Sequence, residues 1–349
     1  MDSSVSLEHV LSMQGGDDDV SFAKNSYGAA AAIASSKQML TSAIHSIKLT
    51  QGCPSNQARP CYKAGHPKFW HGTASNLKIA DLGCAVGDNT FSTVDTVVDV
   101  LRRKLAVIDG GTKPEFEVFF SDLPSNDFNT LFRSLEEKVN GSRQKKYYAA
   151  GVPGSFYRRL FPKGELHVVV TMSALQWLSQ IPEKVMEKGS RTWNKGRVWI
   201  QGAEKEVVEA YAEQSDNDLV EFLKCRKKEI VVGGVLFMLM AGRPSGLVSQ
   251  VSDDSRLKLI FTTLMDQAWQ DLVDEKRDGF NIPVYLRNTG EVAAAIESCG
   301  GFKIEKMEIF KIADPMNARQ QEFMKDPDSY GRAMANLVQA GLKPMISRS

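Results

Sequence analysis

The chain of 349 residues has no excess of charge of either sign, because 43 Lys and Arg side chains face 42 Asp and Glu side chains, for a net charge of +1. That balance indicates neither a nucleic-acid partner nor a membrane partner. Histidine is scarce, at five residues, and the five cysteines form no CxxC pair, so no zinc-ligand spacing is present. We interpret the cysteines as reduced thiols and expect a cytoplasmic protein.

Long apolar runs are also missing. The longest, at residues 230–241, contains Gly233 and Gly234 and is too short to cross a bilayer, so we interpret it as a buried strand. Residues 1–13 carry acidic side chains and no apolar stretch, which argues against a secretory signal. Internal repeats and low-complexity tracts are absent from the sequence as well.

Strand and helix signals alternate along most of the chain. Apolar runs predict strands at residues 77–83, 116–120, 166–171, 197–200, 230–241 and 302–309. Helical periodicity predicts helices at residues 29–48, 89–105, 128–139, 204–228, 255–275 and 291–299. Such alternation is typical of a parallel, doubly wound sheet, so the predicted fold class is α/β with a Rossmann-like sheet.

The same pattern suggests how the chain is divided. We expect residues 1–76 to form an N-terminal segment and helix that help to cover the active site. Residues 77–244 would form the Rossmann-like cofactor-binding core, and residues 245–290 an inserted helical cap over a substrate pocket. Residues 291–349 would return to the core.

A glycine-rich turn follows the first predicted strand, at residues 81–87 (Asp-Leu-Gly-Cys-Ala-Val-Gly). Glycines there let the backbone turn tightly and approach a ligand closely. The third glycine of the dinucleotide fingerprint is missing, and Asp81 suits a cationic group, such as the amino group of a methionine moiety, better than a phosphate. Asp122 ends the next strand, where sheets of this kind bind ribose hydroxyls. The two acids indicate a methyltransferase with a nucleoside cofactor; the alternative for the turn alone is a glycine-rich turn without a ligand.

Six separated motifs resemble, in order, those of the plant SABATH carboxyl methyltransferases. The motifs lie at residues 13–26, 79–84, 121–129, 151–157, 173–179 and 280–283, and the likeness extends over about residues 7–345. The resemblance implies a class I methyltransferase fold, S-adenosyl-methionine as the cofactor and a small-molecule carboxylic acid as the substrate. It also implies a possible homodimer.

The resemblance further implies roles for single residues. Cofactor binding is implied for Phe22, Asn25, Ser26, Asp81, Gly83, Cys84, Asn89, Asp122, Leu123, Ser155 and Phe156. Substrate binding is implied for Gln14, Tyr27, Gln176 and Trp177, of which Gln176 and Trp177 are the catalytic candidates. A Mg²⁺ site is implied at Asn194, Asp278, Phe280 and Asn281. Two amides and a main-chain oxygen make a weak Mg²⁺ site, so the alternative is that these residues only fix a loop.

Within the family, residues 6–16 and 25–31 resemble the gibberellin methyltransferase branch, which implies that the product is the methyl ester of a gibberellin. Two alternatives stay open. One is a carboxyl methyltransferase of indole-3-acetate or another small acid. The other is an inactive paralogue that only binds ligand, an expectation based on Ser349 falling before the last helix and strand of relatives.

The chemistry of ester formation sets modest demands on the protein. A carboxylic acid with a pKa of about 4–5 is already ionised at neutral pH, so no general base is required. The cofactor supplies an activated carbon, and the protein supplies binding and alignment. Trp177 offers one rigid donor for the carboxylate, although a core tryptophan is the alternative. We interpret His167, inside a predicted strand, as structural.

Replacing Trp177 by alanine should lower turnover far more than it lowers cofactor affinity, because the predicted contact of the indole is with the acid alone. Turnover is measured by ester formation and cofactor affinity by calorimetry. A collapse of cofactor binding would make Trp177 a structural residue.

Overall fold

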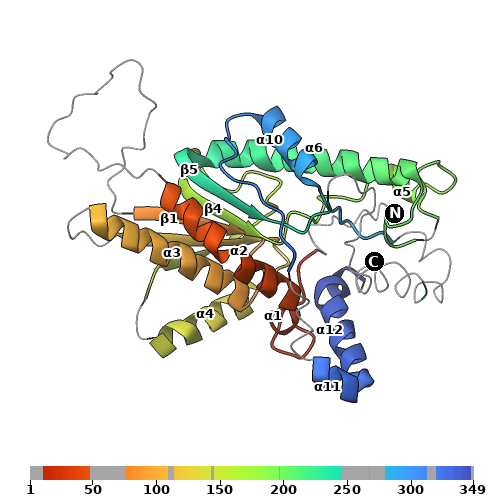
Figure 1. Ribbon diagram of the computed structural model, residues 1–349, viewed down its shortest axis with the longest axis horizontal. Coiled ribbons are helices and arrows are strands. Elements are labelled where there is room, and N and C mark those ends of the chain that lie inside the picture. Colours follow the sequence, from red (N-terminus) through yellow and green to blue (C-terminus); the bar gives the residue numbers. More distant parts are fainter. Residues whose placement is uncertain are drawn as a thin grey trace.

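The computed structural model describes residues 11–47, 76–108, 114–142, 145–195, 197–244, 267, 280–312 and 320–346. A five-stranded sheet in the order β3-β2-β1-β4-β5 forms its centre (Figure 1). The strands are β1 (Asn76–Leu82), β2 (Glu115–Asp122), β3 (Tyr148–Pro153), β4 (Leu166–Met172) and β5 (Ile230–Leu239). Every pairing is parallel, which confirms the predicted α/β class.

Helices cover both faces of the sheet. In sequence order they are α1 (Phe22–Asn25), α2 (Tyr27–Ser46), α3 (Asp88–Ile108), α4 (Phe128–Ser142), α5 (Glu183–Met186), α6 (Lys205–Glu229), α10 (Thr289–Cys299), α11 (Gln320–Lys325) and α12 (Pro327–Ile346). Helices α2, α3 and α4 lie on one face and α6 and α10 on the other, while α11 and α12 stand apart from the sheet (Figure 1). Among the described helices, none is both long and apolar enough to span a membrane.

The two faces of the sheet are built by the alternation of side chains along each strand. On β1, Leu77 and Ile79 join the apolar cluster beneath α2, α3 and α4, whereas Ala80 and Leu82 join the cluster beneath α6 and α10. All seven residues of β4 are buried, as expected of a strand covered on both faces. Burial of each large aliphatic side chain contributes about 1.5–3 kcal/mol, so these two clusters hold the layers together.

Two predicted strands are wrong. Residues 197–200 form bends rather than a strand, although Val198 and Ile200 are buried; the apolar pattern reflects packing of a loop whose Val198 carbonyl accepts from the Ile282 amide. Residues 302–309 have no regular secondary structure and join no sheet in the described part of the chain, and Ile309 is 61% exposed. The alternation of apolar and polar residues there does not indicate whether a neighbouring strand is present. The predicted helix at 255–275, and most of the predicted cap at 245–290, lie outside the described residues.

A buried ion pair ties the end of α6 to the loop that follows β3. The side chains of Arg226 and Glu229 are both 0% exposed, and their N–O distance is 2.7 Å. Arg226 donates to the carbonyl oxygens of Phe156 and Arg158, at 2.7 and 2.9 Å. Glu229 accepts from the amides at positions 160 and 161, at 2.7 and 3.1 Å. We call residues 154–161 the clamped loop, because this pair fixes its backbone along most of its length.

Replacing Arg226 by methionine should lower the free energy of unfolding by about 3–5 kcal/mol, because Glu229 is left as an uncompensated buried charge. Urea denaturation measures the change. Arg226→Met combined with Glu229→Leu should cost less than the sum of the two single variants. Lys224→Ala is the control, since its pair with Glu221 on the same helix is half-exposed; it should leave the free energy of unfolding almost unchanged. Equal effects of Arg226→Met and Lys224→Ala would contradict the assigned role.

Candidate active site

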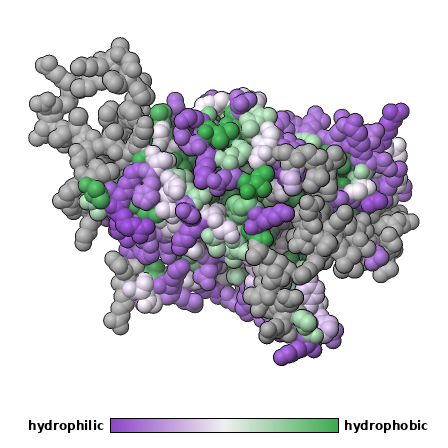
Figure 2. Space-filling view, viewed as in Figure 1, coloured by the Kyte–Doolittle hydropathy of each residue, from purple (hydrophilic) through white to green (hydrophobic). Residues whose placement is uncertain are grey.

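A cavity opens where the carboxyl ends of β1, β2 and β4 meet. The strand order reverses between β1 and β4, and in open α/β sheets the crevice at such a point is where ligands bind. The cavity has a volume of about 1790 Å³, extends between α2 and β5, and reaches residues 301–312. Apolar surface gathers in the middle of the molecule, flanked by hydrophilic surface (Figure 2). All the predicted cofactor-binding residues line this cavity, as do Gln176 and Trp177.

The turn after β1 has a backbone that glycine makes possible. Gly83 and Gly87 have φ of 76° and 102°, and Ala85 between them has φ of 49°. A Cβ on Gly83 would lie 2.4 Å from the Cβ of Ala174, which follows β4. The turn after β1 therefore contacts the turn after β4 directly, and only glycine leaves room for that contact.

Asp122 holds this turn in place from the end of β2. Its carboxylate accepts from the backbone amides of Ala85 and Leu123, both at 2.7 Å. Burial raises the pKa of Asp122 to about 6, and the two amide hydrogen bonds oppose that rise. Each carboxylate oxygen keeps a further lone pair, so Asp122 retains acceptors for the predicted ribose hydroxyls while it fixes the turn.

Asp81 is the more deeply buried of the two acids, with 1% of its surface exposed. Its Oδ2 accepts from the hydroxyl of Thr90 at 2.5 Å, and its Oδ1 is buried with no partner among the described residues. Burial raises the pKa of Asp81 to about 7, and the charge of Asp122 adds to the rise. A buried carboxylate oxygen at a cavity wall is a site that an ammonium group would satisfy.

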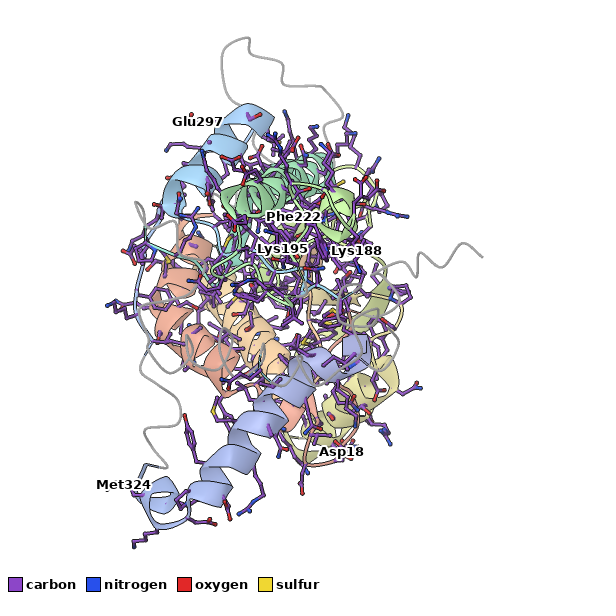
Figure 3. The ribbon with its side chains drawn as sticks, turned by 90° about the vertical axis from the view of Figure 1, so that its right-hand side faces the viewer. Asp18, Lys188, Lys195, Phe222, Glu297 and Met324 are labelled. Atoms are coloured by element: carbon purple, nitrogen blue, oxygen red, sulfur yellow. The ribbon has the colours of Figure 1, made fainter. Side chains whose placement is uncertain are left out.

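The clamped loop forms the opposite wall, through Ser155 and Phe156. The hydroxyl of Ser155 accepts from the Tyr157 amide at 3.3 Å. The Phe156 ring makes edge contacts with the rings of Tyr157 and Phe222, at centroid distances of 4.7 and 5.9 Å. Phe222 lies in the interior of the molecule (Figure 3). Phe156 is thus packed between Tyr157 and Phe222 on one hand and Gly83 on the other. A Cβ added to Gly83 would lie 3.4 Å from the Phe156 ring.

Gln176 and Trp177 follow β4, at the third wall. Ser173 begins this turn with φ of 58°, and its carbonyl accepts from the Gln176 amide group at 2.6 Å. The backbone carbonyl of Gln176 accepts from the backbone amide of Tyr285 at 2.9 Å. In the described part of the chain, the indole nitrogen of Trp177 has no hydrogen-bond acceptor, and Oε1 of Gln176 is buried without a donor. Both residues line the cavity.

The N-terminal residues divide between the cavity and its surroundings. Asn89 on α3 donates to the Ser26 hydroxyl at 2.8 Å, which joins two predicted cofactor residues. Asn25 lines the cavity but donates to the backbone carbonyls of Asp19 and Ser21.

Two predicted substrate-binding residues are not brought to the cavity wall. The Gln14 backbone bonds to Phe22 and Ala340, and Tyr27 packs against Ala333 of α12. Neither residue is among the described residues that line the cavity, although Met13, Ser26 and Gly28 beside them are, and the substrate roles of Gln14 and Tyr27 stay predictions.

The predicted Mg²⁺ residues do not fit a metal site. The amide group of Asn194 donates to the side-chain oxygen of Asn281 at 2.8 Å and to the carbonyl oxygens of Arg197 and Trp199. Three oxygens converge on this amide nitrogen, a donor that takes the place a cation would need, while Oδ1 of Asn194 is buried without a partner among the described residues. These contacts fix a loop, as the alternative expected. Asp278 lies outside the described residues, among which no cluster of three or more His, Cys, Asp or Glu side chains occurs.

Three groups of cavity residues had no predicted cofactor or substrate role. The small residues on one face of α2, such as Ala29, Ala32 and Ser36, line the cavity, and their spacing of three to four was the available signal. Thr90, the partner of Asp81, follows the glycine turn directly. Tyr157 lies within a recognised motif, but its contact with residue 177 is invisible in sequence.

Comparison with known proteins decides the family. The profile of the family described as SAM dependent carboxyl methyltransferase matches residues 69–349. The chain belongs to this family. It is an S-adenosyl-methionine-dependent carboxyl methyltransferase, and S-adenosyl-methionine is its methyl donor.

Relatives of this methyltransferase cover nearly its whole length. Gibberellic acid methyltransferase 1 of Arabidopsis thaliana is 73% identical over 99% of the chain and 89% of the relative. Indole-3-acetate O-methyltransferase 1 of Arabidopsis thaliana is 37% identical over 95% of the chain and 83% of the relative. The solved structure of loganic acid methyltransferase with SAH superposes with a TM-score of 0.77 at 32% identity, over 96% of the chain and 86% of that structure.

Replacing Asp81 by asparagine should weaken the binding of S-adenosyl-homocysteine about tenfold or more at about pH 8, because a charge-assisted hydrogen bond to the ligand ammonium is lost. In the wild type the affinity should fall as pH drops through about 7 and 6, since protonation of Asp81 and then Asp122 removes the negative charge. Calorimetry measures both effects. Asp99→Asn, on the same helix as Asn89 but away from the cavity, is the control.

The ligand-free Asp81→Asn variant should nevertheless melt at a higher temperature than the wild type at about pH 8. The folded-state pKa of Asp81 is raised above its unfolded value of 3.8, so the ionised carboxylate destabilises the folded state above about pH 7. The difference should shrink as pH falls from about 7 toward about 4. A variant that both binds normally and melts lower would contradict the role given to Asp81.

Proposed function

We propose that this methyltransferase makes the methyl ester of a gibberellin. The observation that carries the proposal is the 73% identity to a protein named gibberellic acid methyltransferase 1, over 99% of the chain. A second relative with the corresponding name, gibberellic acid methyltransferase 2, is 57% identical over 98% of the chain. The 37% identity to the indole-3-acetate enzyme supports that substrate much less.

The residues of the cavity support a division of labour. S-adenosyl-methionine supplies an activated methyl group when bound. Asp81 would hold its ammonium group, Asp122 its ribose, and Ser155 and Phe156 would flank its adenine. Trp177 would donate its indole N–H to one oxygen of the acid, which leaves the other oxygen free to face the methyl group. No histidine lines the cavity in the described part of the chain, and an ionised carboxylate needs none.

The size and lining of the acid side favour a bulky apolar acid. The cavity is lined by β5, through residues such as Val235, Phe237 and Leu239 on the face of the sheet that α2 covers, and by the small residues of α2. Apolar walls exclude water from the carboxylate and contact a hydrocarbon skeleton. Retention of Asp81, Asp122 and Trp177 at one cavity supports an active enzyme over a paralogue that only binds ligand. The homodimer and the cytoplasmic location stay predictions.

Purified protein incubated with S-adenosyl-methionine and single acids should form a methyl ester with gibberellins, and much less ester with indole-3-acetate, salicylate or jasmonate. Mass spectrometry detects the ester, and Asp81→Asn serves as the cofactor-deficient control. Ester from another acid alone would refute the substrate but keep the reaction. No ester from any acid, with S-adenosyl-homocysteine still bound in calorimetry, would leave the ligand-binding paralogue as the better description.

A further inference from the structure

Tyr157 lies between the two halves of the active site. It follows Phe156 directly in the clamped loop, and the two rings are in contact at 4.7 Å between centroids. Its hydroxyl donates to the backbone carbonyl of Trp177 at 2.5 Å. One side chain thus contacts both the wall proposed for the adenine and the residue proposed to hold the acid.

The loop end of this connection is rigid. Arg226 and Glu229 fix the clamped loop at residues 156, 158, 160 and 161, immediately around Tyr157. Burial raises the pKa of the Tyr157 hydroxyl well above its ordinary value, so the group stays a donor across the working pH range. The position of the hydroxyl is therefore set by the same loop that sets Phe156.

The Trp177 end is held from other elements. Arg287 donates to the Leu175 carbonyl, and the Asp218 carboxylate accepts from both the amide and the hydroxyl of Ser179, at 2.8 and 2.6 Å. These contacts fix the residues on either side of Trp177 but lie outside the clamped loop. The Trp177 amide donates to the Ala174 carbonyl at 3.1 Å, and Arg287 also lies beside the Tyr157 hydroxyl. Among the described residues, the hydrogen bond from Tyr157 joins the Trp177 carbonyl directly to the clamped loop.

We infer that Tyr157 is a positioning residue that sets the indole N–H of Trp177 relative to the adenine wall at Phe156. The inference rests on the proposed function, because it assumes that Phe156 faces the cofactor and Trp177 the acid. In-line transfer demands close alignment of two bound ligands, and a displacement of about 1 Å can cost about a hundredfold in rate. A single hydroxyl that joins the two binding walls sets that alignment through the peptide of Trp177.

Tyr157→Phe tests the inference, because it keeps the ring against Phe156 and removes only the hydroxyl. The rate constant kcat with saturating acid should fall about tenfold, while the affinity for S-adenosyl-homocysteine stays within about twofold of wild type. Tyr211→Phe is the matched control. Tyr211 is a buried tyrosine on α6 whose hydroxyl donates to the Ile282 carbonyl at 3.3 Å, outside the clamped loop. It should leave kcat within about twofold of wild type.

Fluorine NMR of protein labelled with 5-fluorotryptophan gives a readout that does not need activity. The chain has five tryptophans, and the Trp177 resonance is assigned by its loss in Trp177→Phe. With S-adenosyl-homocysteine bound, Tyr157→Phe should shift or broaden this resonance, and Tyr211→Phe should leave it in place. If the wild type makes no ester, this result still decides the geometry separately from the function.

Three outcomes would overturn the inference. An unmoved Trp177 resonance in Tyr157→Phe would show that the hydroxyl does not position the indole. The same loss of kcat in Tyr157→Phe and Tyr211→Phe would show a general packing effect. A collapse of S-adenosyl-homocysteine affinity in Tyr157→Phe would show that the residue maintains the cofactor wall instead.

Discussion

Close approach of the turns after β1 and β4 is the constraint on which the active site depends. An added Cβ on Gly83 would overlap the Cβ of Ala174, so the two strand ends touch only because residue 83 has no side chain. That contact brings Asp81, at the end of β1, within one cavity with Trp177, three residues beyond Ala174. The parallel sheet supplies the direction of both strands, and the glycine supplies the proximity.

One residue of the site, Asp81, is expected to lower the stability of the ligand-free fold. Asp81 is buried with one carboxylate oxygen unsatisfied in the described part of the chain, and its pKa of about 7 records the penalty on its charge. A neutral side chain would suit the ligand-free protein better. The acid is explained by its ligand, since an ammonium group would provide both the missing donor and the missing charge. The missing donor at Oδ1 is thus the observation that supports an ammonium group as the ligand of Asp81.

Prediction from sequence succeeded where the parallel sheet determines which residues lie close together. Asp81 and Asp122 end neighbouring strands, and parallel strands bring their carboxyl ends to the same edge, so their proximity followed from the strand assignments. It failed where a contact depends on packing between distant segments. Residues 302–309 alternate like a strand, yet alternation does not specify a partner, and none lies beside them among the described residues. The side-chain amides of Asn194 and Asn281 were predicted to be metal ligands, but in the structure they are hydrogen-bonded to each other.

The two halves of the cavity are held by different kinds of contact, which accounts for one family that contains methyltransferases named for different acids. On the cofactor side, backbone positions are fixed by charged groups: Asp122 holds the turn after β1, and Arg226 and Glu229 hold the clamped loop. On the acid side, the walls are apolar side chains of β5 and small residues of α2, which pack without directional bonds. A substitution among the directional contacts disturbs binding of the common cofactor, whereas a change of size along β5 or α2 reshapes only the space for the acid. One scaffold can therefore keep its methyl donor while its carboxylic acid changes.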